Sequence, residues 1–316
     1  MQRMTQLFKQ YIQKNYTLAL VGAILLTLFL MALVYFMQLK LNDTAIHPIA
    51  KKGVFDFSKV DFHTQKHTPL HGEVEFYWQQ FLNPDDFKNK DTLTKPSYLN
   101  LPTSWNNLII ANKKAGAFGY GTFRFLIKVP EPGQYAIKVK EFESAFQIWI
   151  NAKFYDGAGK VATNKSEMTP SWRRKEIYFK TDNDTIEVLL QISNFHHRKG
   201  GASEFMLFGS SDSIRQIKSM RAGVENFLLG ILLILILYHL IIYHYRRSEK
   251  AILYFSLSCI FILLRLSTSG EKILLELLPF ISWGVAIRIE YIALIMITPP
   301  LLMFYHYMLP GNIPVS

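Results

Sequence analysis

The chain has 316 residues, of which 50% are hydrophobic and 19% are charged, and its formal net charge is +11. A single cysteine excludes an internal disulfide framework and a cysteine-rich zinc module. Uncharged stretches near both ends reach the roughly 20 residues that a helix needs to cross a bilayer, which excludes a soluble cytoplasmic enzyme.

The first uncharged stretch covers residues 15–39 and follows residues 1–14, which are basic and contain no acid. A secretory signal peptide has a shorter apolar region and a small-residue cleavage site, and no good site of that kind follows here. We therefore predict an uncleaved signal-anchor helix over residues 15–39, with a cleaved signal peptide as the alternative. Because basic flanks stay in the cytoplasm, residues 1–14 are expected there.

Residues 40–72 are mixed in composition and are predicted to be a linker that leads into the next domain. Four histidines fall in it: His47, His63, His67 and His71. Three of them have helical spacing, which suggests a metal site, but Pro69 disfavours a helix there. Solvated loop histidines are the preferred interpretation, and no metal site is predicted.

Residues 73–212 are predicted to form an all-β sandwich of the jelly-roll type. Short segments alternate apolar and polar side chains, as in Ile137 against Lys138, and turn residues separate them at 130–133, 151, 156–159 and 182–184. This pattern is typical of sandwiches and jelly rolls. Strands are expected over residues 73–81, 119–129, 134–140, 146–150, 175–179, 185–192 and 204–208.

An α-helical membrane domain is predicted after the sandwich. Residues 213–225 are expected to be a tether, and residues 226–316 a partial membrane domain with helices near 226–245, 251–268 and 286–308. The basic loop at residues 246–250 should be cytoplasmic, so residues from about 40 to 222 should lie outside. Pro299 and Pro300 are expected to kink the last helix.

Motifs of common enzymes are missing from the sequence. No nucleophile elbow, phosphate-binding loop or metalloprotease motif occurs, and no acid pair for glycoside cleavage stands out. We therefore expect no catalytic residue, no cofactor and no nucleic-acid partner. Basic membrane flanks that favour anionic lipid account for part of the positive charge.

A second group of residues suits a ligand. Aromatic rings offer stacking faces, and Asn, His and Arg at loop ends offer directional hydrogen bonds for a sugar or small polar molecule. Each also has a structural interpretation: core for the tryptophans, turns for the asparagines, a solvated loop for the histidines. The candidates are Trp105, Tyr120, Arg124, Trp149, Asn151, Trp172, Asn194, His196, His197 and Arg198.

Four charged residues fall near the predicted outer ends of the helices: Arg265, Glu271, Arg288 and Glu290. Charged side chains at or within a membrane are often functional, and these four are candidates for an ion-pair cluster that couples the outside domain to the helices. The alternative is that they only extend toward the membrane surface.

Several stretches resemble bacterial seven-transmembrane receptors with diverse intracellular signalling modules. They are residues 118–125, 145–151, 192–201, 227–239, 251–255, 265–271 and 288–291, and the pair Pro299-Pro300. The resemblance implies an outside domain similar to the galactose-binding-like jelly rolls appended to glycosidases. It also implies seven helices followed by an output module such as a histidine kinase or a cyclase. This chain carries three of those seven helices. Asn151 falls at the family's Asn-Gly turn, but residue 152 is alanine.

The sequence thus predicts the sensory part of a receptor in the bacterial cytoplasmic membrane, which is not itself an enzyme. It would bind a carbohydrate-like or small polar ligand outside and signal through its helices to an output module that this chain lacks. Membrane lipid is an expected partner, and a homodimer is left open. A membrane-anchored carbohydrate-binding or adhesion module without signalling is the alternative, and a glycoside-active enzyme is a third hypothesis.

Overall fold

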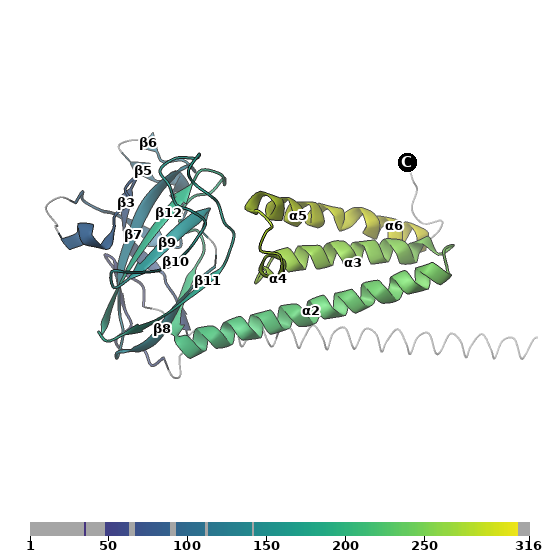
Figure 1. Cartoon of the computed structure of the whole chain (residues 1–316), viewed down its shortest axis with the longest axis horizontal. Helices are drawn as coiled ribbons and strands as arrows, with labels where there is room; N and C mark the ends of the chain where they lie inside the picture. The colour runs from purple at the N-terminus through teal and green to yellow at the C-terminus, as the bar shows by residue number, and fades with distance from the viewer. Residues whose placement is uncertain are drawn as a thin grey trace, which may run out of the picture. The chain divides into compact units, whose positions relative to one another are not determined.

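The computed structural model describes residues 35, 48–62, 67–88, 93–110, 113–140 and 142–308. Apart from Tyr35, the predicted signal-anchor helix over residues 15–39 lies outside the described residues. Residues 46–316 form one compact unit, in which a β-sandwich precedes a group of helices (Figure 1).

The sandwich consists of two main sheets. The larger contains β1 (Val54–Asp56), β3 (Gly72–Trp78), β4 (Ser97–Leu101), β7 (Gly119–Lys128), β9 (Ala145–Ile150), β10 (Lys153–Ala158) and β12 (Thr185–Asn194). Its order is β10-β9-β12-β7-β3-β4, and β1 pairs in parallel with β7. The smaller contains β2 (His67–Pro69), β8 (Gly133–Val139), β11 (Lys175–Thr181) and β13 (Met206–Ser210), in the order β11-β8-β13-β2.

Four short elements complete the described part of the sandwich. A small hairpin is formed by β5 (Ile109–Ile110) and β6 (Lys113–Lys114). Two 3-10 helices are η1 (Pro84–Lys88) and η3 (Trp105–Asn107).

The predicted all-β sandwich is confirmed, and the alternating pattern explains it. In β7 the side chains of Phe123, Phe125 and Ile127 are buried, whereas Arg124 between them lies on the outer face. Apolar side chains two residues apart share one face of a strand, so each sheet covers the core with one face. All other pairs in the two main sheets are antiparallel.

Two local features differ from the sequence prediction. The lead-in segment contributes β1 and β2, since Phe55 and Phe57 are buried in the core, and His67 is buried as well rather than solvated. Residues 156–158 belong to β10 instead of a turn. The chain reverses earlier, at Asn151 and Ala152, whose φ angles of 49° and 64° are both positive, as a two-residue type I′ hairpin requires.

The core between the sheets is rich in aromatic side chains. Phe208 stacks on Phe57 with ring centroids 5.7 Å apart and on Tyr135 at 5.3 Å. Trp105 stacks on Phe76 at 6.0 Å and is fully buried. Large rings bury much apolar surface, so this packing is expected to supply most of the stability of the sandwich.

The helices follow the last strand: α2 (Ser211–Tyr245), α3 (Lys250–Thr268), α4 (Ile273–Leu277), α5 (Trp283–Met296) and α6 (Thr298–Met308). Three apolar stretches are long enough to cross a membrane: Ser211–Tyr245, Lys250–Thr268 and Trp283–Met308. The helix α3 packs against α2, α5 and α6 (Figure 1). The last stretch is divided into α5 and α6 at Ile297, two residues before Pro299, where the proline ring interrupts regular hydrogen bonding.

The predicted tether over residues 213–225 is helical. The helix α2 has 35 residues. At about 1.5 Å per residue it is roughly 50 Å long, well over the roughly 30 Å of a bilayer core. Its charged first turns therefore extend beyond the membrane. No loop separates it from β13, because Ser210 ends the strand and caps the helix, its Oγ accepting from the amide of Ser213 at 3.3 Å.

Candidate functional site: the charged junction between sandwich and helices

The start of α2 packs on the smaller sheet. Ile214 and Ile217 are buried against Ala136 of β8 and Leu207 of β13. We use "junction" for this contact together with the neighbouring contacts of residues 171–176 and the α3–α4 connection, residues 269–272. Because a strand leads directly into a packed helix, a shift of β13 would move the first turns of α2 as well.

Lys138 is the central charge of the junction. It lies on β8, and its side chain is fully buried. Its Nζ donates to both carboxylate oxygens of Glu271 at 2.9 Å and lies 3.2 Å from Oε1 of Glu176. The sequence places Lys138 on the polar face of β8, which is correct, but the helical region covers that face. A buried ammonium is tolerated because two carboxylates surround it.

Glu271 connects the sandwich to two helices at once. Besides Lys138, its carboxylate accepts from Nη1 of Arg174 at 3.3 Å. Its backbone amide donates to both carboxylate oxygens of Glu225 on α2 at 2.9 Å. A Cβ at Gly270 would lie 1.9 Å from Oε1 of Glu225, so a side chain here would displace that carboxylate, and the φ of 56° favours glycine as well. The α3–α4 connection is thus held from the sandwich side and from the α2 side.

Glu176 of β11 lies between two ammonium groups. Nζ of Lys218 on α2 donates to its Oε2 at 2.9 Å, and Lys138 approaches the other oxygen. Burial by itself would raise the pKa of Glu176, but the hydrogen bond from Lys218 and the charges of both lysines outweigh it and lower that pKa. The carboxylate is therefore charged at neutral pH.

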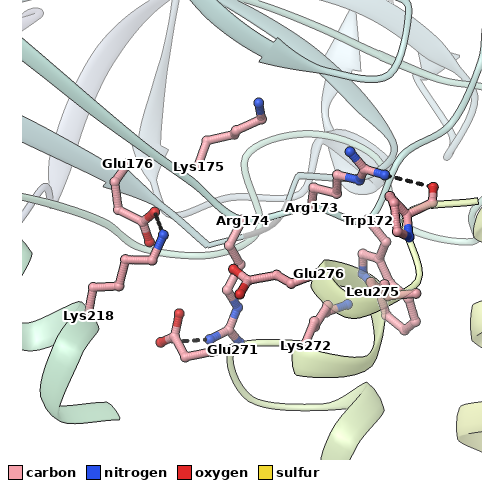
Figure 2. Close-up of a pocket in the computed structure, with 11 residues that line it drawn as sticks. Trp172, Arg173, Arg174, Lys175, Glu176, Lys218, Glu271, Lys272, Leu275 and Glu276 are labelled. Carbon is pink, nitrogen blue, oxygen red and sulfur yellow. Dashed lines mark hydrogen bonds and ion pairs between the residues drawn. The ribbon is translucent and has the colours of Figure 1, made fainter. Parts of the chain in front are cut away.

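A cavity of about 320 Å³ opens beside these ion pairs (Figure 2). Nζ of Lys272 lies 3.1 Å from the ring centroid of Trp172, a cation–π contact. Nη2 of Arg173 donates to the carbonyl oxygen of Pro279 at 3.0 Å. We call this cavity the junction pocket; its lining is Trp172, Arg173, Arg174, Lys175, Glu176, Lys218, Glu271, Lys272, Leu275, Glu276 and Pro279.

The four predicted coupling residues do not form one cluster. Arg265 of α3 makes an ion pair with Glu290 of α5, between two helices. Glu271 instead pairs with the sandwich, and Arg288 is exposed on α5. The single cluster expected from the sequence is therefore wrong: the pair between the helices and the pair with the sandwich are separate. The reason is that α3 ends between Arg265 and Glu271, and the chain turns toward the sandwich there.

The candidate ligand residues are dispersed over several places. Trp105 is a correction: its side chain is fully buried in the core, where no ligand can stack on it, and its Nε1 donates to the carbonyl oxygen of Ala117 at 3.1 Å. Trp172 is half-buried and lines the junction pocket. Tyr120 is half-buried beside Phe81, with ring centroids 4.8 Å apart.

Arg124 and Trp149 share the outer face of the larger sheet, since both pair with Leu189 of β12 in register. Arg124 donates to Glu187 at 2.7 Å and to Glu75 at 3.1 Å. Trp149 is half-buried and packs edge-on against Phe154 at 5.4 Å. Nearby, Oδ1 of the turn residue Asn151 accepts from the amide of Glu187 at 2.9 Å.

Asn194 is buried and organises the loop that follows it. Its Nδ2 donates to the carbonyl oxygens of Ala117, His197 and Lys199 at 2.9, 2.7 and 2.8 Å. The side chain therefore fixes the loop and does not face a ligand.

The loop residues themselves lie at its surface. His196 is half-buried, with Nδ1 3.3 Å from Sδ of Met168 and its ring 6.0 Å from Trp283 at the start of α5. Burial lowers the pKa of His196, and the charge of Lys165 adds to this. Nδ1 of His197 lies 3.2 Å from the carbonyl oxygen of Lys199, and Arg198 is exposed.

Sequence reasoning missed the basic side of the junction: Lys138, Arg174, Lys218 and Lys272, with Glu176 between them. Lys138 and Glu271 are separated by 133 positions. The only signal in the sequence was a charged residue within a strand of alternating pattern. A charged residue in such a strand ordinarily faces water, so it did not indicate a buried contact. Within the described residues, no group of three or more His, Cys, Asp or Glu is placed to hold a metal ion.

Comparison with known proteins gives one family match. The family described as "7TM diverse intracellular signalling" matches residues 221–312. A comparison with curated protein sequences gives no match. The match and the three apolar helices support a membrane protein, and the matching family is one of transmembrane sensory receptors.

Solved structures resemble part of the sandwich region only distantly. One is a GH2 β-galacturonidase from Eisenbergiella tayi bound to galacturonate, with a TM-score of 0.33 and 9% identity, covering 46% of this chain and 24% of that chain. Another is a β-glucuronidase from Ruminococcus gnavus, with a TM-score of 0.32 and 10% identity, covering 46% of this chain and 28% of that chain. The chain thus spans about a quarter of these enzymes, and such scores support no statement about ligand or activity. Residues 221–312 match the seven-transmembrane family with diverse intracellular signalling, and over that segment the resemblance predicted from the sequence is confirmed.

Proposed function

We propose that the chain is the sensory part of a bacterial transmembrane signalling receptor. The sandwich lies outside the cytoplasmic membrane, with the N-terminus and the basic loop at residues 246–250 inside, and it binds a carbohydrate-like or small polar ligand. The helices pass the change to a cytoplasmic output module. The observation that supports this most is the direct bond between buried Lys138 of the sandwich and Glu271 of the α3–α4 connection.

A relay requires an element with two arrangements that ligand binding can bias. The junction suits this role, because β13 continues into α2 without a loop and the α3–α4 connection is bonded to both the sandwich and α2. A displacement of the smaller sheet would therefore act on α2 and α3 together. A binding module that only anchors itself to the membrane needs no such double attachment.

The ligand surface that we propose is the outer face of the larger sheet around Arg124 and Trp149. A half-buried indole offers a stacking face, and an arginine held by Glu75 and Glu187 offers a fixed donor. Tyr98 is exposed in the same cross-strand row and extends this surface. Trp105 and Asn194 are not part of it, since both are buried.

The test uses the full chain in lipid nanodiscs with Cys259 replaced by serine and spin labels at Tyr245→Cys and Tyr307→Cys, which lie near the ends of α2 and α6. A panel of neutral and acidic monosaccharides is screened for binding by calorimetry. We expect a bound sugar to change the distance between the labels. Glu271→Gln should retain binding and lose the change, whereas Glu204→Gln, an exposed acid paired with Lys140 at 3.6 Å, should keep both.

Two results would contradict this proposal. Binding without any change in the label distance would favour the anchored binding module. An absence of binding across the panel would remove carbohydrate as the ligand class.

A further inference from the structure

A second cavity, of about 300 Å³, is lined by the sandwich segment at residues 169–173 and by the helices α4 and α5. Two indole rings belong to its lining: Trp172 of the sandwich and Trp283, the first residue of α5. Its aliphatic part includes Leu275 and Ala286, both buried. We call this cavity the indole pocket. Because it has walls from both regions, a bound molecule would contact the sandwich and the helices together.

The indole pocket contains far less charge than the junction pocket. Among the described residues that line it, Arg173 is the charged one, and its exposed guanidinium donates to the carbonyl oxygen of Pro279 at 3.0 Å. The remaining polar side chains carry hydroxyl groups, as Ser171 and Ser282 do. An ion would lose its hydration between such apolar walls without a buried counter-charge. The pocket therefore favours an uncharged group.

The polar atoms of the indole pocket include unused hydrogen-bond donors. Within the described residues, the indole N–H groups of Trp172 and Trp283 donate to no protein group. Ser282 stands at the N-cap of α5, and its side chain makes no capping hydrogen bond. An indole N–H can donate but cannot accept. A matching ligand must therefore combine an apolar body with acceptors, and the carbonyl oxygens of an ester are acceptors of this kind.

The location of the indole pocket indicates where such esters come from. Trp283 begins a stretch that is long and apolar enough to cross a membrane. The chain just before it exposes large apolar side chains, with Leu277 71% and Phe280 81% exposed. Apolar and aromatic side chains at such a position insert between the lipid headgroups and the acyl chains. The ester groups of phospholipids lie at the same depth.

We propose that the indole pocket binds one phospholipid of the surrounding bilayer, with an acyl chain against Leu275 and Ala286 and its ester carbonyls at the indole N–H groups. A hydrocarbon chain gains little by leaving other lipid chains. The gain comes from the protein, since the chain covers apolar walls that would otherwise face water or a void. A volume of about 300 Å³ is near the lower end of small-molecule sites and accommodates part of a lipid. This goes beyond the proposed function, because the lipid binds whether or not a sugar does.

The experiment releases the full chain from phosphatidylcholine nanodiscs and uses native mass spectrometry to measure the ratio of chain with one retained lipid to chain with none. We expect the unaltered chain to retain a lipid. Trp283→Ala should lower the ratio about tenfold or more, because a large apolar wall of the pocket is lost. Ser171→Phe fills the pocket from the sandwich side and should lower the ratio as well, so it serves if Trp283→Ala folds poorly.

Phe280→Ala is the matched control, because it removes an exposed ring close to Trp283 in the chain but outside the pocket lining. It should retain lipid like the unaltered chain. A second arm uses the diether analogue of the same lipid, which has the same chains and headgroup but no ester carbonyl. The ratio should then fall about two- to tenfold, as the loss of one hydrogen bond predicts. Three results would overturn the proposal: no retained lipid in the unaltered chain, equal ratios for Trp283→Ala and Phe280→Ala, or equal ratios for the diester and diether lipids.

Discussion

The interior of the sandwich contains mainly aromatic and aliphatic side chains, whereas the junction between the sandwich and the helices contains mainly charged ones. Phe57, Phe208 and Tyr135 stack in the first region, and Lys138 is held by Glu176 and Glu271 in the second. Apolar packing is insensitive to pH and weakly sensitive to salt, while ion pairs respond to both.

This difference has a consequence for the proposed relay. A sandwich that keeps one packing arrangement moves as a body, and the charged contacts at its base are the ones that can exchange partners. The proposed ligand surface and the proposed relay are therefore stabilised by different forces and can be altered separately. The following changes test that separation, beginning with the largest effect.

Trp105→Ala should lower the free energy of unfolding of the sandwich by about 3–5 kcal/mol, the usual loss for a large aromatic side chain deleted from a core. The reason is that Trp105 is fully buried and packs on Phe76 and Trp78. Denaturant unfolding followed by β-sheet circular dichroism measures the loss. Trp149→Ala, at a half-buried position on the outer face, should lose much less. Equal losses would mean that the two tryptophans have the same role.

Lys138→Met should destabilise the junction by about 3 kcal/mol, because two buried carboxylates would lose their shared partner. We expect faster hydrogen exchange at the amides of residues 269–277, with protection of the sandwich core retained. Lys140→Met, which removes only a partly exposed pair with Glu204, is the matched control. Unchanged exchange in the α3–α4 connection would show that Lys138 does not hold it.

Arg124→Gln should change the free energy of unfolding by less than about 1 kcal/mol, because its pairs with Glu75 and Glu187 are partly exposed to water. It should nevertheless abolish binding of any sugar found in the calorimetric screen. A large loss of stability would show that this group is structural, as the Lys138 group is.

Acidification should weaken the junction before it affects the core. The pKa of Glu176 is lower in the folded protein than its usual value of 4.5, so its stabilising contribution is present above that value and is lost as the pH falls through the lower folded-state pKa. Hydrogen exchange in residues 269–277, measured at decreasing pH, should accelerate in that window. Glu176→Gln should flatten this pH dependence, and an unaltered profile would contradict the assignment.

The sequence by itself determined seven strands of the sandwich and the three apolar helices. Period-two alternation around Phe123 and Phe125 and the long uncharged runs are local properties, since they depend only on which side chains share a face or fill a bilayer. The same reasoning located charged residues near the outer ends of the helices, including Glu271. It also named Arg124 and Trp149 as candidate ligand residues, with the sandwich core as the alternative for the tryptophan.

Only the tertiary structure decided which of these residues meet. Lys138 and Glu225 look like ordinary surface charges in the sequence, and Trp105 looks as suitable for a ligand as Trp172. A strand pattern indicates which face of the sheet a side chain occupies. Whether that face is buried depends on which other segment packs on it, and the partner of Lys138 lies 133 positions away in the chain. The junction exists because α3 ends, the chain turns at Gly270, and Glu271 reaches the outer face of a sheet formed much earlier in the chain.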